Sequence, residues 1–274
     1  WGTEGGVEQA VSELAPRLVE QGCEVTVYCR PQYNRLGNTI VQGVRLVNVP
    51  TLSGRGAEAF LHSAISAPLA AFSHSIVHLH AAGPALFAPL PRLLHRKVVV
   101  TLHGKDWERE KWGPTARSLL RLGASVAGHQ SHHLIGVSSD LTRWIQQNYS
   151  VPATYIPNGV RPHRFLPWDP ARFPMLQPGH YDLYLGRLVP EKELHTLFSA
   201  LHQIQRKKPV VIVGGLSSDP YIQKLQQNAP PSVIFLGSRF EEEKAMLLSH
   251  ARCFLFPSRV EGFSIALQAE GYGL

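Results

Sequence analysis

The sequence predicts an α/β protein that contains two doubly wound parallel sheets, and three observations carry this prediction. Apolar runs typical of strands alternate with segments of helical apolar spacing throughout the 274 residues. The run KVVVTLHG, residues 97–104, is continuous, as in a strand buried on both faces of a parallel sheet. A proline-rich linker over residues 161–180 interrupts the alternation, which then restarts and predicts two domains, residues 1–165 and 166–274.

In the first domain the elements follow one another closely. Apolar residues recur at helical spacing over residues 7–22, where Gly22 supplies a C-terminal glycine. Ser139 or Asp140 caps a further helix over residues 140–149. We also expect helices over residues 83–96 and 115–128, and strands over residues 24–29, 44–50, 75–80, 97–104, 133–139 and 153–160.

The second domain repeats the alternation. We expect strands over residues 182–187, 209–215, 232–237 and 253–258, and helices over residues 193–207, 219–229 and 241–251. Doubly wound sheets bind ligands at the carboxyl ends of their strands, so polar residues that follow strands are site candidates. The first domain opens in a glycine-rich loop instead of a strand, and the second stops where a helix should continue. We therefore expect both domains to be truncated, with the first strand of the first domain missing.

Charge and cysteine usage narrow the class of protein. The net charge of +7 favours anionic partners such as phosphates or an acidic membrane surface. The excess is spread over both halves of the chain, which disfavours a nucleic-acid partner. No apolar run reaches the roughly 20 residues that span a bilayer, and no signal-peptide pattern is present. Three widely spaced cysteines fit structural thiols in a reducing compartment, with a disulfide as the alternative.

Two cations follow the first expected strand of the second domain. Arg187 and Lys192 lie in the turn that joins the strand DLYLGR to a helix. A helix N-terminus offers unpaired N–H groups and a positive dipole end, so two cations beside it would bind a diphosphate. The alternative is a solvated arginine and an ordinary Glu–Lys pair at a helix start.

A second candidate site follows the strand CFLFPS. Glu261 can accept hydrogen bonds from sugar hydroxyls, and Gly262 allows backbone to approach a ligand closely. A helix that starts near Ser264 would direct its N-terminus at a phosphate. The alternative is a loop acid beside an N-cap serine.

Five blocks in order identify a family resemblance: GGVEQAVSELAPRLVEQGCEVTVYCR, TLHGKDWEREKWG, YIPNGV, YLGRLVPEK and FPSRVEGFSIAL. Together they resemble the retaining nucleotide-sugar glycosyltransferases of family 4, which have the two-domain GT-B fold. The match is closest to bacterial members that build surface polysaccharide. The resemblance implies two Rossmann-like domains that face a cleft.

The resemblance also implies roles for residues on the acceptor and phosphate sides. The Gly5–Gly6 loop resembles the glycine-rich loop that approaches donor phosphate and acceptor. His103 resembles the histidine that contacts the transferred sugar near the reacting carbon, with a core histidine as the alternative. Asp106 and Trp107 would shape the acceptor side. Arg187 and Lys192, already singled out by their position, resemble the pair that neutralises the departing diphosphate.

The donor-sugar segment matches the family only in part. Glu261 resembles the first glutamate of the E-x7-E motif, which binds hydroxyls of the donor sugar, but Ala269 occupies the position of the second glutamate. Glu193 also departs from the family, which usually has glycine after PEK, and an acid near a phosphate site is unfavourable by like-charge repulsion. The remaining residues expected to bind the donor sugar or nucleotide are Gly262, Phe263, Ser264, Gln268 and Glu270.

These residues predict an enzyme that moves a sugar from a nucleotide-diphosphate donor, UDP- or GDP-linked, to a glycan or lipid-linked acceptor with retention. His103 and Glu261 would be its catalytic residues, and we expect no cofactor, no metal and no nucleic-acid partner. A cytoplasmic location, with peripheral contact at the inner face of the cell membrane, completes the prediction. The main alternative is a non-catalytic binding remnant. A metal site at His78 and His80, which share one strand face, is disfavoured because no third ligand has suitable spacing.

Overall fold

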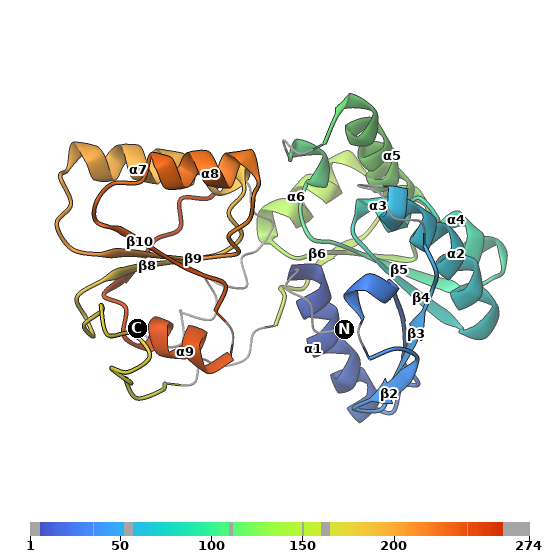
Figure 1. Ribbon diagram of the computed structural model, residues 1–274. Coiled ribbons are helices and arrows are strands. Elements are labelled where there is room, and N and C mark those ends of the chain that lie inside the picture. The colour runs from blue at the N-terminus through green and yellow to red at the C-terminus, as the bar shows by residue number, and fades with distance from the viewer. Residues whose placement is uncertain are drawn as a thin grey trace. The chain divides into compact units, whose positions relative to one another are not determined.

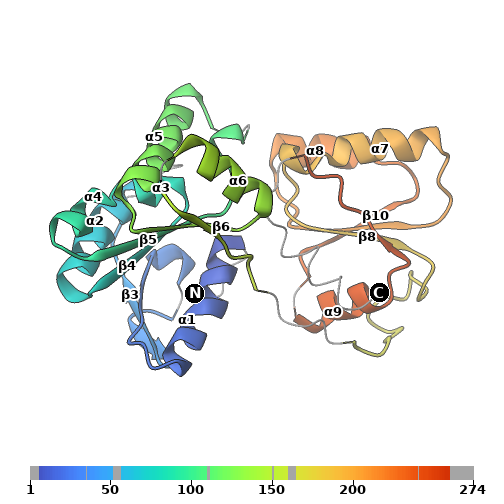
Figure 2. The same ribbon diagram turned by 180° about the vertical axis from the view of Figure 1, so that it is seen from behind.

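The structure is a computed structural model, and it describes residues 6–34, 36–51, 57–109, 112–149, 151–159, 165–239 and 241–259. The chain divides into two compact units, Trp1–Gly159 and Val160–Leu274, called unit 1 and unit 2 below (Figures 1 and 2). Each unit is built around parallel strands with helices packed against them, as the alternation in the sequence predicts.

The main sheet of unit 1 has four parallel strands in the order β4-β5-β6-β7. These strands are β4 (Ile76–His80), β5 (Lys97–Leu102), β6 (His133–Gly136) and β7 (Ala153–Tyr155). The continuous apolar run of β5 is central, and Val98, Val100 and Leu102 on it are fully buried. Burial on both faces explains why this strand carries no polar alternation.

A smaller sheet precedes it in the chain. Its order is β1-β3-β2, and it comprises β1 (Thr26–Cys29), β2 (Thr39–Val41) and β3 (Val44–Asn48). Strands β1 and β3 are parallel, whereas β2 and β3 form an antiparallel hairpin that the sequence analysis did not predict. Helix α1 (Gly6–Glu20) packs through Ala15 onto the core of this sheet.

The helices of unit 1 differ from expectation in two places. Helix α2 (Ala57–Ser73) was not predicted. The helix expected over residues 83–96 is instead two short helices, α3 (Ala82–Ala85) and α4 (Pro89–Leu93). Prolines at 84, 89 and 91 explain the break, because proline supplies no backbone N–H and fits best in a first helical turn.

The other helices of unit 1 follow the prediction. Helices α5 (Pro114–Gln130) and α6 (Ser139–Asn148) cover the sheet, with short 3-10 turns at Pro31–Tyr33 and Asp106–Glu108. The predicted cap of α6 at Ser139 or Asp140 is wrong by one or two residues: Ser138 is the cap, since its hydroxyl accepts the N–H of Leu141 at 3.2 Å. Helices α3 and α5 lie side by side (Figures 1 and 2), and Gly123 makes this contact, because a Cβ there would strike the carbonyl of Ala82.

Unit 2 contains one parallel sheet in the order β10-β9-β8-β11. Its strands are β8 (Asp182–Leu185), β9 (Val210–Val213), β10 (Val233–Gly237) and β11 (Cys253–Phe254). Helices α7 (Leu194–Gln203) and α8 (Pro220–Gln227) lie on one face, and α9 (Glu241–Ser249) lies on the other (Figure 1). Strand β11 is shorter than the expected 253–258.

The proline-rich segment contributes to the core of unit 2. Residues 165–181 form no helix or strand, yet Phe173 and Leu176 are buried in the cluster that includes Tyr181, Leu183 and Leu247. The Tyr181 hydroxyl donates to the carbonyl of Leu247 at 2.7 Å. The described part of this segment therefore packs onto the sheet.

A buried carboxylate ties strands of unit 2 together at their amino-terminal ends. Asp182, 4% exposed, is the first residue of β8. Arg206 bonds one carboxylate oxygen, and Arg252 donates to the other from Nε at 2.9 Å. Because Arg206 precedes β9 and Arg252 precedes β11, this cluster fixes the register of three neighbouring strands.

Within the described residues, none of the helices has the length and apolar character needed to cross a membrane.

Candidate functional site

The carboxyl ends of β4 and β5 in unit 1 carry two histidines in contact. His80 is the last residue of β4, and His103 directly follows β5 and is 9% exposed. The register pairs His80 with Thr101, so His103 lies two residues beyond the partner of His80, just past the end of β5. His103 thus occupies the strand-end position that the sequence predicts for it.

A row of hydrogen bonds and ring contacts connects three histidines. Nδ1 of His80 and Nε2 of His103 are 3.1 Å apart and form a hydrogen bond. Nε2 of His78 lies 2.8 Å from the hydroxyl oxygen of Thr101, and the rings of His78 and His80 are 4.1 Å apart between centroids. Strand alternation in the sequence groups His78 with His80, but it does not reveal His103 as their neighbour. The register of β4 against β5 was the missing information.

The environment of this histidine row keeps its members neutral. Burial lowers the pKa of His78 to about 4 and, with smaller contributions from His78 and Arg109, lowers the pKa of His103 to about 4. Burial also lowers the pKa of His80 well below its ordinary value. Neutral imidazoles can each donate one hydrogen bond and accept another.

These lowered pKa values predict a loss of stability in mild acid. The unfolded chain takes up protons near the ordinary histidine pKa of about 6.5, whereas the folded chain resists them until about pH 4. The free energy of unfolding should therefore be full above about pH 6.5 and fall as the pH drops toward 4, by a few kcal/mol in total. Urea unfolding at pH 7, 6 and 5 measures this change.

A matched pair of variants assigns the effect. His78→Asn should flatten the pH dependence of unfolding, whereas His133→Asn, on the exposed start of β6, should leave it as in wild type. Equal pH dependence in wild type and His78→Asn would contradict the assignment.

The loop after His103 combines a buried ring with an ion pair. Trp107 is 5% exposed and packs against Trp144 of α6, with 5.1 Å between ring centroids. Asp106 pairs with Arg109, whose Nε lies 3.3 Å from its carboxylate. The buried ring of Trp107 thus anchors the loop. Of the two predicted acceptor-side residues, Asp106 is the one whose side chain can form hydrogen bonds with an acceptor.

In unit 2, the predicted phosphate-binding pair lies at the carboxyl end of β8. Arg187 is exposed, and its backbone carbonyl accepts the hydroxyl of fully buried Tyr184 at 3.0 Å. Gly186 has to be glycine here, because a Cβ would lie 2.8 Å from that hydroxyl. Lys192 ends a 3-10 turn, Pro190–Lys192, directly before α7.

The segment after β11 meets this turn. The N–H of Arg259 donates to the carbonyl of Glu191 at 3.2 Å, and Nζ of Lys192 lies 5.5 Å from the ring centroid of Phe256. The carboxyl ends of β8 and β11 therefore bring together the cationic turn and the segment that leads to the predicted donor-sugar residues. Arg259 was not predicted as a site residue, although it lies in the segment after β11 as Arg187 lies after β8.

Glu193 has a conformation and a set of partners that the sequence did not reveal. Its φ of 54° is left-handed, which explains why glycine is usual at this position of the family. Its carboxylate accepts the hydroxyl of Thr196 at 2.6 Å, and it lies 3.2 Å from Nε2 of His195 and 3.8 Å from Nε of Arg259. These neighbours therefore partly offset the repulsion that the negative charge of Glu193 is expected to exert on a bound phosphate.

Several predicted residues lie outside the described part of the chain. Gly6 begins α1, but its loop partner Gly5 is not described. The others are Glu261, Gly262, Phe263, Ser264, Gln268 and Glu270. Their roles remain predictions.

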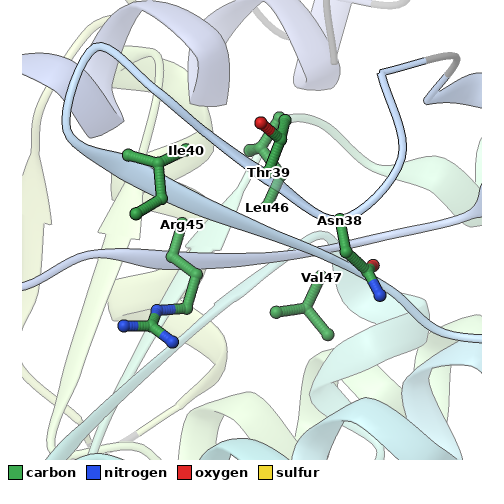
Figure 3. A pocket seen from close by; sticks show the side chains of 6 residues that line it. All are labelled: Asn38, Thr39, Ile40, Arg45, Leu46 and Val47. Atoms are coloured by element: carbon green, nitrogen blue, oxygen red, sulfur yellow. The ribbon is translucent and has the colours of Figure 1, made fainter.

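The hollow shown in Figure 3 lies on the β2–β3 hairpin and encloses about 280 Å³. It contains none of the predicted site residues. Its lining residues are Asn38, Thr39, Ile40, Arg45, Leu46 and Val47. Among the described residues, no group of three or more histidine, cysteine or acidic side chains has an arrangement that could hold a metal ion.

Two units with parallel sheets, each with polar residues at the carboxyl ends of its strands, have the architecture of the GT-B glycosyltransferases. Residues 4–164 match the model of Glycosyltransferase Family 4, and residues 180–270 match that of Glycosyl transferases group 1. Since the first match covers more than half of the chain, this protein belongs to glycosyltransferase family 4.

Similar proteins support this assignment. The chain is 29% identical over 300 residues to a GDP-mannose-dependent alpha-(1-6)-phosphatidylinositol monomannoside mannosyltransferase of Mycobacterium tuberculosis, covering 98% of this chain and 73% of that protein. It is 26% identical over 200 residues to the uncharacterized glycosyltransferase YqgM of Bacillus subtilis, covering 70% of this chain and 55% of YqgM.

Solved structures share the fold. The Anabaena protein Alr3699/HepE, crystallised with UDP and glucose, superposes with a TM-score of 0.77 at 17% identity, covering 98% of this chain and 76% of that one. A glycosyltransferase from Rickettsia africae has a TM-score of 0.66 at 17% identity, covering 93% and 70%. At these identities the likeness concerns the fold alone.

Proposed function

We propose that this protein transfers a hexose from a nucleotide-diphosphate sugar to a glycan or lipid-linked acceptor, with retention at the anomeric carbon. One observation carries the proposal. Arg187, Lys192 and the N-terminus of α7 come together at the carboxyl end of β8, where doubly wound sheets bind ligands. Family membership and the donor named for the mycobacterial relative support it.

The chemistry that such a site must supply is charge stabilisation. As the bond between sugar and phosphate breaks, negative charge grows on the departing diphosphate and positive charge grows on the sugar ring. Two cations and a helix N-terminus offset the negative charge, so the proposal requires no cofactor and no metal ion. The donor would be UDP- or GDP-linked.

Unit 1 would act on the sugar and the acceptor. His103 is neutral at physiological pH, so its ring can exchange hydrogen bonds with sugar hydroxyls without adding positive charge beside a developing cation. We propose the same sugar-binding role for Glu261. Asp106, in the loop that follows His103, would contact the acceptor.

The acceptor proposal extends to the location of the protein. A surface-polysaccharide pathway would use a lipid-linked acceptor, and the net charge of +7 favours an anionic lipid surface. We therefore propose a cytoplasmic enzyme in peripheral contact with the inner face of the cell membrane.

A panel of UDP-, GDP- and ADP-sugars tests the proposed function. The purified protein should release nucleoside diphosphate from one donor in the presence of an acceptor, and proton NMR of the product should show a retained anomeric configuration. Binding of a nucleotide sugar with no turnover for any acceptor would favour a non-catalytic binding protein instead.

The partners of Glu193 predict that this acid limits donor affinity. Glu193→Gln removes a negative charge from the phosphate site and releases Arg259 and His195, so the Kd for UDP or GDP should fall by about three- to tenfold. Titration calorimetry with each nucleotide measures this change. Glu242→Gln, a surface acid on α9, provides the matched control and should leave the Kd unchanged. Weaker nucleotide binding by Glu193→Gln would mean that the carboxylate supports the site.

A further inference from the structure

His80 is the partner of the proposed sugar-contacting histidine, and the function proposed above gives it no role. It ends β4, while His103 lies just beyond the end of β5. A single hydrogen bond, Nδ1 of His80 to Nε2 of His103 at 3.1 Å, joins the two side chains. Their rings stack with an interplanar angle of 29° and 5.4 Å between centroids.

We propose that His80 is a positioning residue, which fixes the ring orientation and the tautomer of His103 so that Nδ1 of His103 faces the transferred sugar. This inference rests on the proposed role of His103 in sugar contact. Within the described residues, Nε2 of His103 is engaged by His80, and this leaves Nδ1 as the ring nitrogen that can meet a ligand. A neutral ring carries one N–H, so the proton position in the His80–His103 bond decides whether Nδ1 donates or accepts.

The surroundings of His80 fix its own ring in turn. His78, two residues earlier on the same strand face, packs 4.1 Å from His80 between ring centroids and bonds the hydroxyl of Thr101 on β5. The backbone after His80 is also constrained, because Ala81 has a φ of 76° and donates its N–H to the carbonyl of Thr101 at 2.8 Å. Strained backbone of this kind persists only where the surrounding structure holds it.

His78 and Arg109 are the charged or titratable groups that contribute to the lowered pKa of His103, and His80 bonds its ring. The guanidinium of Arg109 is directed to Asp106 at 3.3 Å. His80 is therefore the side chain among these neighbours that bonds the His103 ring directly, within the part of the chain that the structure describes.

Two amide substitutions separate positioning from simple packing. In His80→Asn the side-chain amide reaches the place of Nδ1 and can still bond Nε2 of His103, whereas in His80→Gln it reaches toward the place of Nε2. Both side chains are polar and smaller than histidine, so neither should overpack the site and both variants should fold. His80→Asn should keep kcat within about threefold of wild type, while His80→Gln and His80→Leu should lose about 10- to 100-fold in kcat.

The donor KM provides the second readout. Because positioning acts on the reacting geometry, KM for the nucleotide sugar should change less than about threefold in all three variants. His133→Asn, at the exposed start of β6, is the control and should match wild type in kcat and KM. Equal losses in His80→Asn and His80→Gln, or wild-type kcat in His80→Gln, would overturn the proposal.

Nitrogen NMR of the histidine rings tests the pair without catalysis. In wild type the ring nitrogens of His103 should show one tautomer, and in His80→Leu they should show the averaged shifts of a mixture. A mixture of His103 tautomers in wild type would overturn the inference. The same single tautomer in wild type and in His80→Leu would overturn it too. A wild-type protein that turns over no donor would instead refute the proposed function. The spectra would still show whether His80 fixes the tautomer of His103, so the two failures can be told apart.

Discussion

Replacing Arg187 by alanine is expected to lower turnover of the nucleotide sugar by two to three powers of ten, equivalent to about 3–4 kcal/mol of barrier. The buried hydroxyl of Tyr184 bonds the backbone carbonyl of Arg187, so the backbone that carries this exposed side chain is fixed before the donor binds. A cation held beside the departing diphosphate stabilises its growing negative charge. Steady-state kinetics with the preferred donor measure the loss.

Two further substitutions separate charge from position. Arg187→Lys keeps the cation but loses the planar guanidinium, so it should recover only part of the lost turnover. Lys208→Ala removes an exposed cation that precedes β9. This cation lies at the amino-terminal ends of the strands, away from the proposed phosphate site, so the variant should leave turnover unchanged. Wild-type turnover in Arg187→Ala, or an equal loss in Lys208→Ala, would count against a phosphate role for Arg187.

Replacing Asp182 by asparagine is expected to destabilise unit 2 by about 3 kcal/mol. The carboxylate is 4% exposed, and it bonds Arg206 through one oxygen and Arg252 through the other. The amide keeps the shape but leaves two guanidinium groups without their counter-charge in a partly buried place. Urea unfolding followed by hydrogen exchange at β8 and β9 measures the loss where it should occur.

The matched control for Asp182 is another ion-paired acid of the same unit. Glu242 has a side chain 69% exposed and pairs with Arg172 at 3.3 Å, so Glu242→Gln should change the unfolding free energy by less than about 0.5 kcal/mol. If Asp182→Asn were as stable as Glu242→Gln, the buried cluster would contribute no more than an exposed pair.

The strands other than β2, and the ends at which polar residues follow them, were predictable because they depend on local apolar runs. Strand β8 is buried at every position, and its apolar run is visible in the sequence. The location of Arg187 and Lys192 after its carboxyl end could therefore be predicted. Helix α2 was missed, because alanine, leucine, isoleucine and phenylalanine surround its axis, so no apolar face stands out, and because Pro68 lies within it. The split of residues 83–96 into α3 and α4 was also missed. The apolar residues there recur at helical spacing, and this pattern predicted one helix although three prolines lie within it.

The strand-end positions of the described site candidates were predictable one by one, but their contacts were not. His103 was identified from its place after a buried strand and from the family resemblance. Its bond to His80 depends on the register between two strands, which no local pattern records. Glu193 was expected to repel phosphate, while its partners Thr196 and Arg259 follow from a left-handed turn and from the return of the chain after β11.

The left-handed backbone at Glu193 has a consequence for protein engineering. Substitutions that improve an enzyme often cost it stability, because active sites store strain. Here a glycine would relieve a conformation that is unfavourable for any residue with a Cβ, by about 1 kcal/mol, and would also remove a carboxylate that competes with the donor. The same replacement gives up the hydrogen bond from Thr196, so the relief of backbone strain offsets that loss while donor binding improves.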